Sequence, residues 1–249
     1  MGAGDLFDDA AMAVGYAYDR PPVHPHLMTR LAGTDAWGGQ VEVAVDVGCG
    51  AGASTAALIS LARRVTGLDP YVSMIRAARA AVRGATFVVA GAEALPCASG
   101  SVDLLAAAGA LNYVDLDAFA RDADRVLGPD GMIVVSDYGF GRPEGDGFSD
   151  DWPERFVRRC PRPASTRIDA ASFAGTPFRV VVDERFAVSI PLAPAAYLAY
   201  VMADTAVAQA VAGGTPPDEI RAWCAAALLD GFRAELPVTF ECALVVLTR

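Results

Sequence analysis

The stretch VEVAVDVGCGAG (residues 41–52) constrains the fold of this chain more than any other part of its sequence. Its first seven residues are mostly β-branched or apolar, which is typical of a strand buried on both faces of a sheet. The strand leads directly into Gly48 and Gly50, where the missing side chains permit a tight turn and let a ligand contact the main chain. A helix that begins near Ala51 or Ala53 would point its free N–H groups at that ligand. The segment predicts a binding turn between a strand and a helix, and the alternative is an ordinary connection that binds nothing.

Short apolar strands alternate with helical patterns over the first part of the chain. The predicted strands are 41–47, 85–90, 101–108 and 131–138, together with a second strand along the chain whose last residues are 64–69. The predicted helices are 53–65, 71–82 and 115–127. Such alternation implies a mainly parallel sheet with helices on both faces. Ligands of these sheets bind beyond the carboxyl ends of the strands, which is where the glycine turn falls.

The pattern loosens after Tyr138. Residues 139–165 are rich in glycine, proline and charge, and they predict an inserted cap or loop with one short helix near 151–159. The remaining sequence predicts strands and helices that complete the fold. These are one strand or a bent pair at 178–190, a strand at 238–248, and helices at 193–214 and 216–232.

Composition excludes several classes of function. Thirty acidic residues against twenty basic ones give a formal charge of −10, which argues against nucleic acid or membrane partners. Every basic residue is arginine, and the absence of lysine excludes Schiff-base chemistry and a P-loop lysine. The five cysteines lack metal-ligand spacing, so we expect no metal site. An acidic N-terminus and the absence of a long apolar run predict a cytoplasmic protein.

An acidic residue strengthens the prediction of a binding site. Asp69 ends the second strand, 21 residues after Gly48, where its carboxylate can accept hydrogen bonds from both ribose hydroxyls of an adenosine. The alternative role for Asp69 is an N-cap of the next helix. The glycine spacing differs from the dinucleotide pattern, and Asp46 in the strand would repel a phosphate but suit an ammonium group. These residues favour an amino-acid nucleoside over a nicotinamide dinucleotide.

The ordered set of motifs resembles the class I S-adenosylmethionine-dependent methyltransferases, in particular the small-molecule group with the methyltransferase type 11 domain. VAVDVGCGAG is similar to the first motif, GLDPYVSMI to the acidic second one, and AGAEALPCASGSVDLL to the third and fourth. ALNYVDLDAFARDADRVLGPDGMIVVSD is similar to the strand–helix–strand that follows, and AVGYAYDRPPVHPHLMTRL (13–31) to an N-terminal lid. The resemblance covers nearly the whole chain.

The resemblance implies a Rossmann-like three-layer α/β/α sandwich with a mainly parallel seven-stranded sheet, an N-terminal helical lid and an inserted cap. It places one methyltransferase domain over residues 1–249. Its parts would be a lid (1–35), a cofactor-binding core (36–138), a cap (139–177), and a C-terminal completion of the sheet with two helices (178–249). The implied function is methylation of a small molecule, with a role in natural product metabolism as one setting.

The resemblance also assigns site residues for S-adenosylmethionine and its product, S-adenosylhomocysteine. Asp46 and the backbone of Gly48, Cys49 and Gly50 would hold the methionine end, and Asp69 would hold the ribose. The adenine contacts would come from Pro70, Met74, Ala92 and Glu93, the methyl-transfer face from Ala108 and Asn112, and the lid contacts from Tyr16 and Arg20.

Methyl transfer is an in-line displacement, in which the enzyme aligns the acceptor and excludes water. A carboxylate acceptor needs no base, but a hydroxyl, phenol, ammonium or activated carbon generally does. His24 and His26 are the only side chains whose unperturbed pKa lies near neutrality, and we nominate His24 as the catalytic base. The alternative is a solvated loop histidine, and Tyr113 and Asp137 are weaker nominations.

Two other functions stay open at this stage. One keeps the fold and the cofactor but performs a different reaction, such as a cyclisation. The other is an NAD(P)-binding oxidoreductase, which the glycine spacing and the absence of a Tyr-x-x-x-Lys motif oppose. Arg158 and Arg159 could bind an anionic acceptor or could form a solvated helix face. The acceptor, the methylated atom and the oligomeric state are not predicted.

Overall fold

One sheet organises the computed structural model, which describes residues 7–144, 151–229 and 235–249. Within these residues it has eight strands in the order β3-β2-β1-β4-β5-β8-β6, and β7 pairs with β8 off this path. β1 to β5 pair in parallel, whereas β8 is antiparallel to β5, β6 and β7. The strands are β1 (Val41–Val47), β2 (Ala62–Asp69), β3 (Thr86–Val89), β4 (Val102–Ala108), β5 (Leu127–Tyr138), β6 (Arg142–Pro143), β7 (Arg179–Leu192) and β8 (Leu236–Thr248). The mainly parallel, Rossmann-like sheet is confirmed.

The eighth strand is the difference from the seven that we expected. It is the two-residue β6, in the segment that we predicted as a cap, where Arg142 pairs with Thr239 and Pro143 with Val238. Proline removes a backbone donor and is therefore confined to the edges of sheets. So short an edge strand carries no apolar pattern by which the sequence could reveal it.

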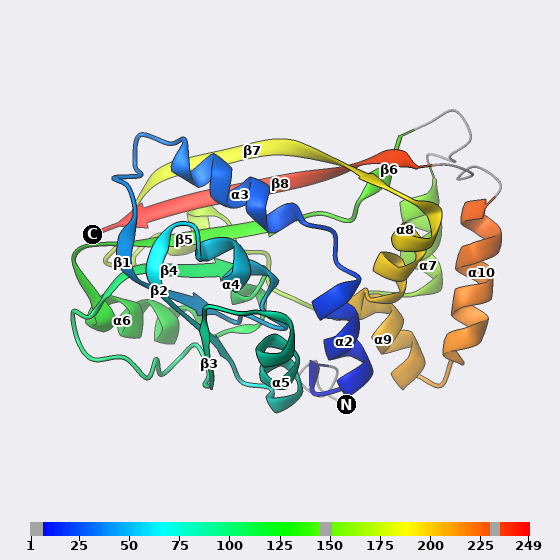
Figure 1. Cartoon of the computed structure of the whole chain (residues 1–249), viewed down its shortest axis with the longest axis horizontal. Coiled ribbons are helices and arrows are strands. Elements are labelled where there is room, and N and C mark those ends of the chain that lie inside the picture. The colour runs from blue at the N-terminus through cyan, green and yellow to red at the C-terminus, as the bar shows by residue number, and fades with distance from the viewer. Residues whose placement is uncertain (1–6, 145–150, 230–234) are drawn as a thin grey trace.

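Helices cover both faces of the sheet, as the alternating pattern predicts. They are α2 (Ala10–Tyr18), α3 (Val23–Ala32), α4 (Ala53–Leu58), α5 (Val72–Ala81), α6 (Leu116–Val126), α7 (Trp152–Arg159), α8 (Pro194–Met202), α9 (Thr205–Ala212) and α10 (Pro217–Leu229), with short 3₁₀ turns at Leu111–Tyr113 and Ala170–Phe173. Figure 1 shows α2 between the strands of the core and the helices α8 and α9. Parts of the predicted lid (1–6) and cap (145–150), and residues 230–234, lie outside the described residues.

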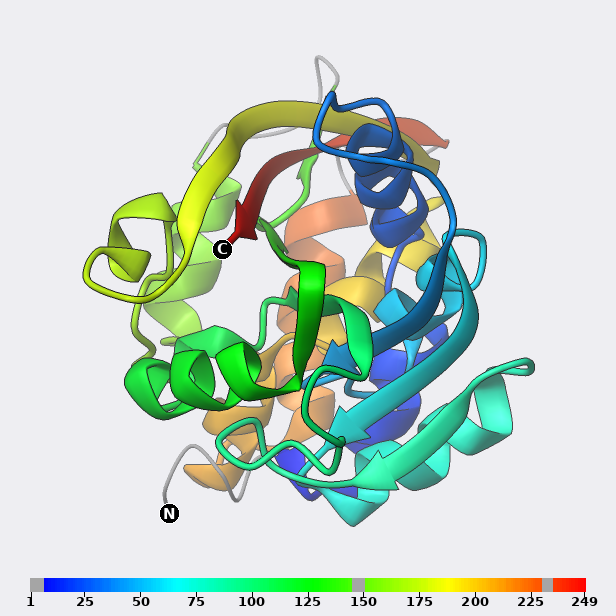
Figure 2. The same cartoon turned by 90° about the vertical axis from the view of Figure 1, so that its left-hand side faces the viewer.

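Neighbouring residues of the central strands point into two separate cores. Leu104 of β4 packs with α3 and α4, whereas Leu105 packs with α6. Successive side chains of a strand leave opposite faces of the sheet, so this alternation places one helical layer on each side. Figure 2 shows α3 and α6 on opposite sides of the sheet. Burial on both faces explains why these strands are continuously apolar.

Two predicted helices are shorter than their patterns indicated. The helix predicted at 53–65 ends at Leu58, because the chain from Ala62 onward pairs with β1 as β2. The helix predicted at 193–214 breaks into α8 and α9. At the break, the Asp204 side chain accepts a hydrogen bond from the Ala206 N–H at 2.9 Å and caps α9. Aspartate is a strong N-cap, and here that preference ends one apolar helix and begins another.

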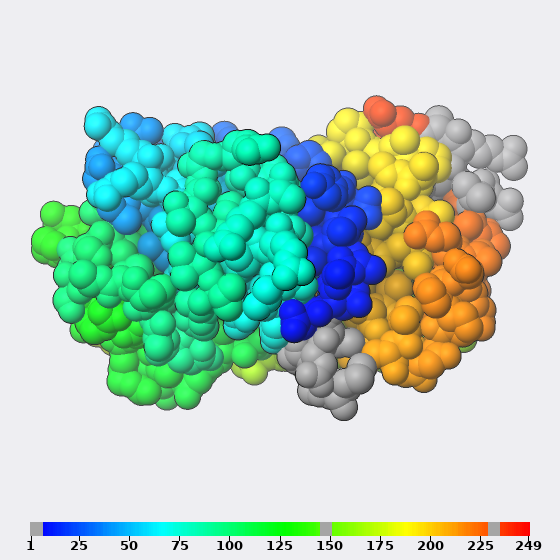
Figure 3. All heavy atoms as spheres, turned by 60° about the horizontal axis from the view of Figure 1, so that its bottom comes forward, coloured from blue at the N-terminus to red at the C-terminus, as the bar shows by residue number. Residues whose placement is uncertain are grey.

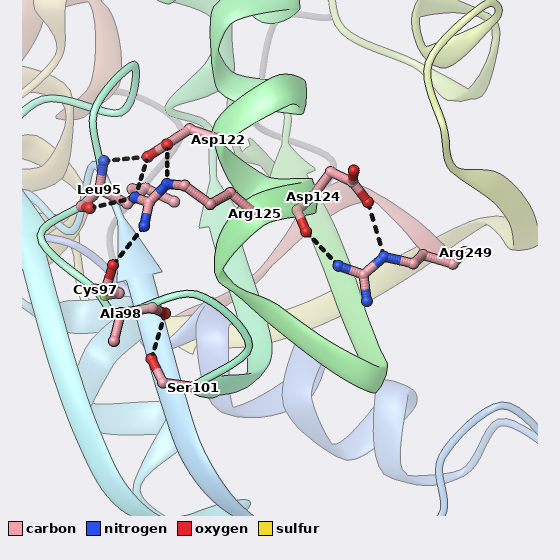
Figure 4. Close-up of polar contacts among 8 residues, drawn as sticks. All are labelled: Leu95, Cys97, Ala98, Ser101, Asp122, Asp124, Arg125 and Arg249. Carbon is pink, nitrogen blue, oxygen red and sulfur yellow. Dashed lines mark hydrogen bonds and ion pairs between the residues drawn. The ribbon is translucent and has the colours of Figure 1, made fainter.

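Two arginine side chains form hydrogen bonds at the end of the sheet opposite the glycine turn, where β5 begins and β8 ends. The Arg125 guanidinium of α6 donates to the carbonyls of Leu95 and Cys97 at 2.9 and 2.7 Å and pairs with Asp122 (Figure 4). Arg249, which follows β8, pairs with Asp124 on the same helix. These charge-assisted bonds tie the helix to a loop and to the last strand.

Among the described residues, no single helix is long and apolar enough to cross a membrane. The pair α8 and α9 reaches that length only together, with a bend of 55° between its two parts.

Candidate active site

The carboxyl ends of the parallel strands open onto a cavity of about 530 Å³. Its walls come from the chain that follows β1, β2, β4 and β5, from the N-terminal helices, and from the junction of α8 and α9. Figure 3 shows α2, in blue, at the surface between the core and the C-terminal helices. The cavity therefore lies where an open parallel sheet binds its ligands.

The glycine turn forms the floor of the cavity. Gly48 and Gly50 have φ angles of 67° and 52°, which glycine adopts without strain. A Cβ on Gly48 would lie 2.3 Å from the Cβ of Ala110, so the close approach of the loop after β4 also requires glycine. The Cys49 N–H donates to the Leu68 carbonyl at 2.9 Å and fixes the turn to β2. Gly48 and Gly50 therefore present main chain, and no side chain, to a ligand.

Asp69 joins the end of β2 to this turn. Its Oδ2 accepts a hydrogen bond from the Gly50 N–H, and its Oδ1 accepts one from the Tyr71 N–H, both at 2.9 Å. The carboxylate is buried at the cavity wall, and burial raises its pKa although both hydrogen bonds lower it. The N-cap of α5 is Tyr71, so Asp69 does not occupy the N-cap position that we weighed as its alternative role. Each oxygen of an ionised carboxylate can accept a second hydrogen bond, and both are held in place to do so.

Asp46 lies behind the cavity rather than in its wall. Its Oδ2 accepts hydrogen bonds from the hydroxyls of Ser54 and Thr55, both at 2.6 Å, whereas its buried Oδ1 has no partner in the described part of the chain. Burial raises the pKa of Asp46 to about 6. Ser54 does line the cavity, so Asp46 would act on a ligand through the start of α4. Asp46, which we expected to hold the methionine end, does not itself line the cavity.

The other residues predicted from the sequence surround the same space. The cavity is lined by Tyr16, Arg20, His24, Gly48, Cys49, Gly50, Asp69, Pro70, Met74, Ala92, Glu93, Ala108 and Asn112. Met74 is almost fully buried and packs against Met12 and Ala13 of α2, so it also holds the N-terminal helix in place. These residues come from separate elements and meet only in the folded chain.

Arg20 is the most enclosed positive charge at the cavity. Its guanidinium carbon lies 4.2 Å from the ring centroid of Tyr16 and 5.8 Å from that of Tyr200. Its buried Nε has no hydrogen-bond partner among the described residues. Such cation–π contacts position a guanidinium without using its N–H donors.

His24 occupies an environment that differs from the one we assumed for a base. Burial, together with the positive charge of Arg20, lowers the pKa of His24 to about 4. Its ring makes a T-shaped contact with Tyr138 at 5.5 Å, and its buried Nδ1 has no partner within the described residues. At neutral pH the imidazole is uncharged and a weak base. The pKa near neutrality that led us to nominate His24 is therefore absent in the fold.

Comparisons with known proteins agree on one family. Residues 45–135 match the family model described as a methyltransferase domain. A Dictyostelium discoideum protein designated as a candidate methyltransferase is 30% identical over 98 residues, which are 39% of this chain and 37% of that protein. The solved structure of a candidate type II methyltransferase from Anaeromyxobacter dehalogenans covers 89% of this chain and 94% of its own, with 25% identity and a TM-score of 0.66. Residues 45–135 of this chain form a methyltransferase domain, and the structure around them has the class I methyltransferase fold. The resemblance to class I methyltransferases that the motifs indicated is confirmed.

The match to the curated relative spans 37% of that relative's length. A second solved structure, the YcgJ protein of Bacillus subtilis, covers 89% of this chain and 97% of its own at 18% identity, with a TM-score of 0.53. At that identity it shows the shared fold alone. The methyltransferase domain itself contains the glycine turn and Asp69 but not the N-terminal helices or the segments that follow β5.

Several cavity residues outside the motifs escaped the sequence analysis. Arg162, Tyr138, Phe140 and Asp204 all line the cavity of the methyltransferase domain, and none belonged to a motif that we recognised. Arg158 and Arg159, which we considered for anion binding, do not line it. A signal for Arg162 was present, because it stands between two prolines in CPRPAS and its backbone is thereby restricted.

The lowered pKa of His24 predicts a stability that depends on pH. Between about 4 and 6.5 the unfolded chain binds a proton at this position that the folded chain does not, so the free energy of unfolding should fall as the pH falls through this window. We expect His24 to contribute a loss of about 2 kcal/mol between about pH 7 and about pH 5.

Denaturant unfolding of wild type and His24→Gln at these two pH values measures that contribution as a difference. Asp46 acts in the opposite direction, because its pKa is raised, and it cancels in the comparison. His26→Gln is the matched control, since His26 is exposed and does not line the cavity. An equal pH dependence in His24→Gln and wild type would contradict a lowered pKa of the His24 imidazole.

Proposed function

We propose that this chain is an S-adenosylmethionine-dependent methyltransferase that acts on a small molecule. The observation that carries the proposal is the convergence of the Gly48–Gly50 turn and the Asp69 carboxylate on one cavity. A geranyl diphosphate methyltransferase solved in complex with S-adenosylmethionine shares the fold at 17% identity, with a TM-score of 0.50. When bound, the cofactor would supply an electrophilic methyl group on a sulfonium.

The residues at the cavity fit such a cofactor. The two glycines of the turn leave room for the amino-acid portion, and the Asp69 oxygens retain acceptor capacity for vicinal ribose hydroxyls. Apolar side chains suited to adenine line the same wall. These are Pro70, Met74 and Ala92, with Glu93 beside them.

The methyl-transfer face in this proposal lies beyond β4 and β5. Ala108 ends β4 and Asn112 follows it, and the Asn112 amide donates to Asp137 Oδ2 at 3.4 Å. The lid residues Tyr16 and Arg20 would close the methionine end. We propose that His24, which lines the cavity, contacts the acceptor as a neutral imidazole. Alignment and exclusion of water would supply most of the catalysis.

The wider setting is part of the same proposal. A cavity of about 530 Å³ is of the size that encloses small ligands, so the acceptor would be a small molecule and not a polymer. We propose a cytoplasmic enzyme built as a lid, a cofactor-binding core, a cap and a C-terminal completion, with natural product metabolism as one setting.

The experiment is incubation with S-adenosylmethionine and a panel of small acceptors, with S-adenosylhomocysteine and methylated products measured by mass spectrometry. We expect both to form in equal amounts and only when an acceptor is present. A product formed without S-adenosylhomocysteine would instead indicate a non-methylating reaction on the same cofactor. Turnover of a nicotinamide dinucleotide, detected by its absorbance, would contradict the proposal.

A further inference from the structure

Arg162 brings a second positive charge to the cavity from outside the methyltransferase domain. It follows α7, and its guanidinium carbon lies 5.4 Å from the ring centroid of Phe140. Its Nη2 is 3.5 Å from Asp204 Oδ2, and the Asp204 side chain is itself fixed as the cap of α9. Flanking prolines restrict the backbone. The guanidinium is therefore held on two sides and oriented by the fold.

Arg162 nevertheless keeps N–H donors available for a ligand. The contact with Asp204 is an ion pair at the limit of hydrogen-bond length, and Arg162 makes no hydrogen bond within the described residues. A guanidinium has five N–H donors in a planar fork that matches an oxyanion. The side chain is 43% exposed and lines the cavity, so a ligand can reach it. The Arg162 guanidinium, with its orientation fixed and N–H donors available, is suited to bind an anion.

Arg162 lies beside the end of β5, because its guanidinium contacts Phe140, which follows that strand. Asp137 lies near the end of β5, where burial raises its pKa and the charges of Arg20 and Arg162 act against this rise. The wall around Arg162 is aromatic, with Phe140, Tyr138 and Tyr200 lining the same cavity. A ligand in this part would combine a planar or apolar body with a negative group.

We propose that Arg162 determines acceptor specificity by binding a carboxylate of the methyl acceptor, so that the preferred acceptors are acids with an apolar body. The inference rests on the proposed function and adds the class of acceptor to it. The methionine carboxylate of the cofactor is the other source of the same chemistry, and the experiment separates the two.

The experiment measures ligand binding and needs no known acceptor. Wild type, Arg162→Gln and Arg159→Gln are titrated by calorimetry with S-adenosylhomocysteine and with 5′-methylthioadenosine, which lacks the amino-acid carboxylate. The S-adenosylhomocysteine complexes are then titrated with phenyl-substituted carboxylic acids of increasing chain length and with their matched amides and amines. Arg159 is the control because it is exposed on α7, pairs with Glu219 and does not line the cavity.

We expect at least one acid to bind wild type more tightly than its amide and amine, and Arg162→Gln to weaken that acid by about tenfold or more. Both variants should bind S-adenosylhomocysteine as wild type does, and Arg159→Gln should keep acid binding. Arg162→Lys, which keeps the charge but loses the fork, should weaken the acid less than Arg162→Gln does.

Three results would overturn the inference while leaving the proposed function intact. In the first, Arg162→Gln binds the acids as tightly as wild type does. In the second, the amides or amines bind wild type as tightly as the acids. In the third, wild type binds no acid at millimolar concentration. Loss of S-adenosylhomocysteine affinity in Arg162→Gln, with 5′-methylthioadenosine affinity unchanged, would assign Arg162 to the cofactor's carboxylate instead. Failure of wild type to bind S-adenosylhomocysteine at all would contradict the proposed function.

Discussion

Asp69→Ala is expected to weaken the binding of S-adenosylhomocysteine by at least about tenfold. Hydrogen bonds to a charged group contribute about 1.5–3 kcal/mol each, and the variant would lose a pair of them to the ribose. It would also release the Gly50 N–H that Asp69 holds at 2.9 Å, so the glycine turn would lose one of its anchors. Asp69→Asn, which keeps one acceptor oxygen, should lose less affinity.

Calorimetric titration and thermal unfolding of the same variants separate binding from folding. The control is Asp169→Ala, because Asp169 also accepts a backbone hydrogen bond, from Ser172, but does not line the cavity. Loss of such a cap costs about 0.5–2 kcal/mol of stability, and the affinity of the control should be that of wild type. If Asp69→Ala behaved like Asp169→Ala, with a lower melting temperature and an unchanged affinity, Asp69 would be a structural residue only.

Gly48→Ala is the second change for which we expect a large effect. A left-handed φ costs a residue with a side chain about 1–2 kcal/mol, and the new Cβ would lie 2.3 Å from the Cβ of Ala110. The turn after β1 or the loop after β4 would have to move, and both line the cavity. We expect lower stability together with a loss of S-adenosylhomocysteine binding that exceeds tenfold.

Gly100→Ala is a matched control for this change. Gly100 has a φ of 66°, almost equal to the 67° of Gly48, but an added Cβ would meet no atom within 4 Å. It also does not line the cavity. Gly100→Ala should therefore show the backbone cost alone, with normal affinity. Equal effects of the two changes, measured by denaturant unfolding and calorimetry, would mean that the close approach at Gly48 contributes nothing.

The part of the site that could be predicted from the sequence is encoded locally. The strand, the glycine turn and Asp69 stand in order along the chain, and parallel pairing of Val47 with Leu68 brings the turn beside Asp69. The identity of Asp69 as an acceptor for the Gly50 N–H was not predicted, since it depends on that register. The pattern of apolar strands likewise predicted the layers, because both faces of the sheet are buried.

The remainder of the site depends on packing between distant segments. Asp204 breaks a continuous apolar pattern and places Tyr200 and itself at the cavity. Arg162 reaches the same place from the segment after α7, where the sequence shows only prolines and charge. The pKa of His24 is lowered by burial and by the charge of Arg20. Neither the burial nor the position of Arg20 beside His24 could be derived from the isolated sequence RPPVHP. A sequence motif records residues that are close together along the chain, whereas most of these contacts join residues that are far apart in it.

Calorimetric titration of the wild-type protein with S-adenosylhomocysteine, with NAD in a parallel titration, tests the central claim most directly. We predict saturable binding of one S-adenosylhomocysteine per chain, reduced at least tenfold by Asp69→Ala, and no binding of NAD. Binding of NAD without any binding of S-adenosylhomocysteine would contradict the account.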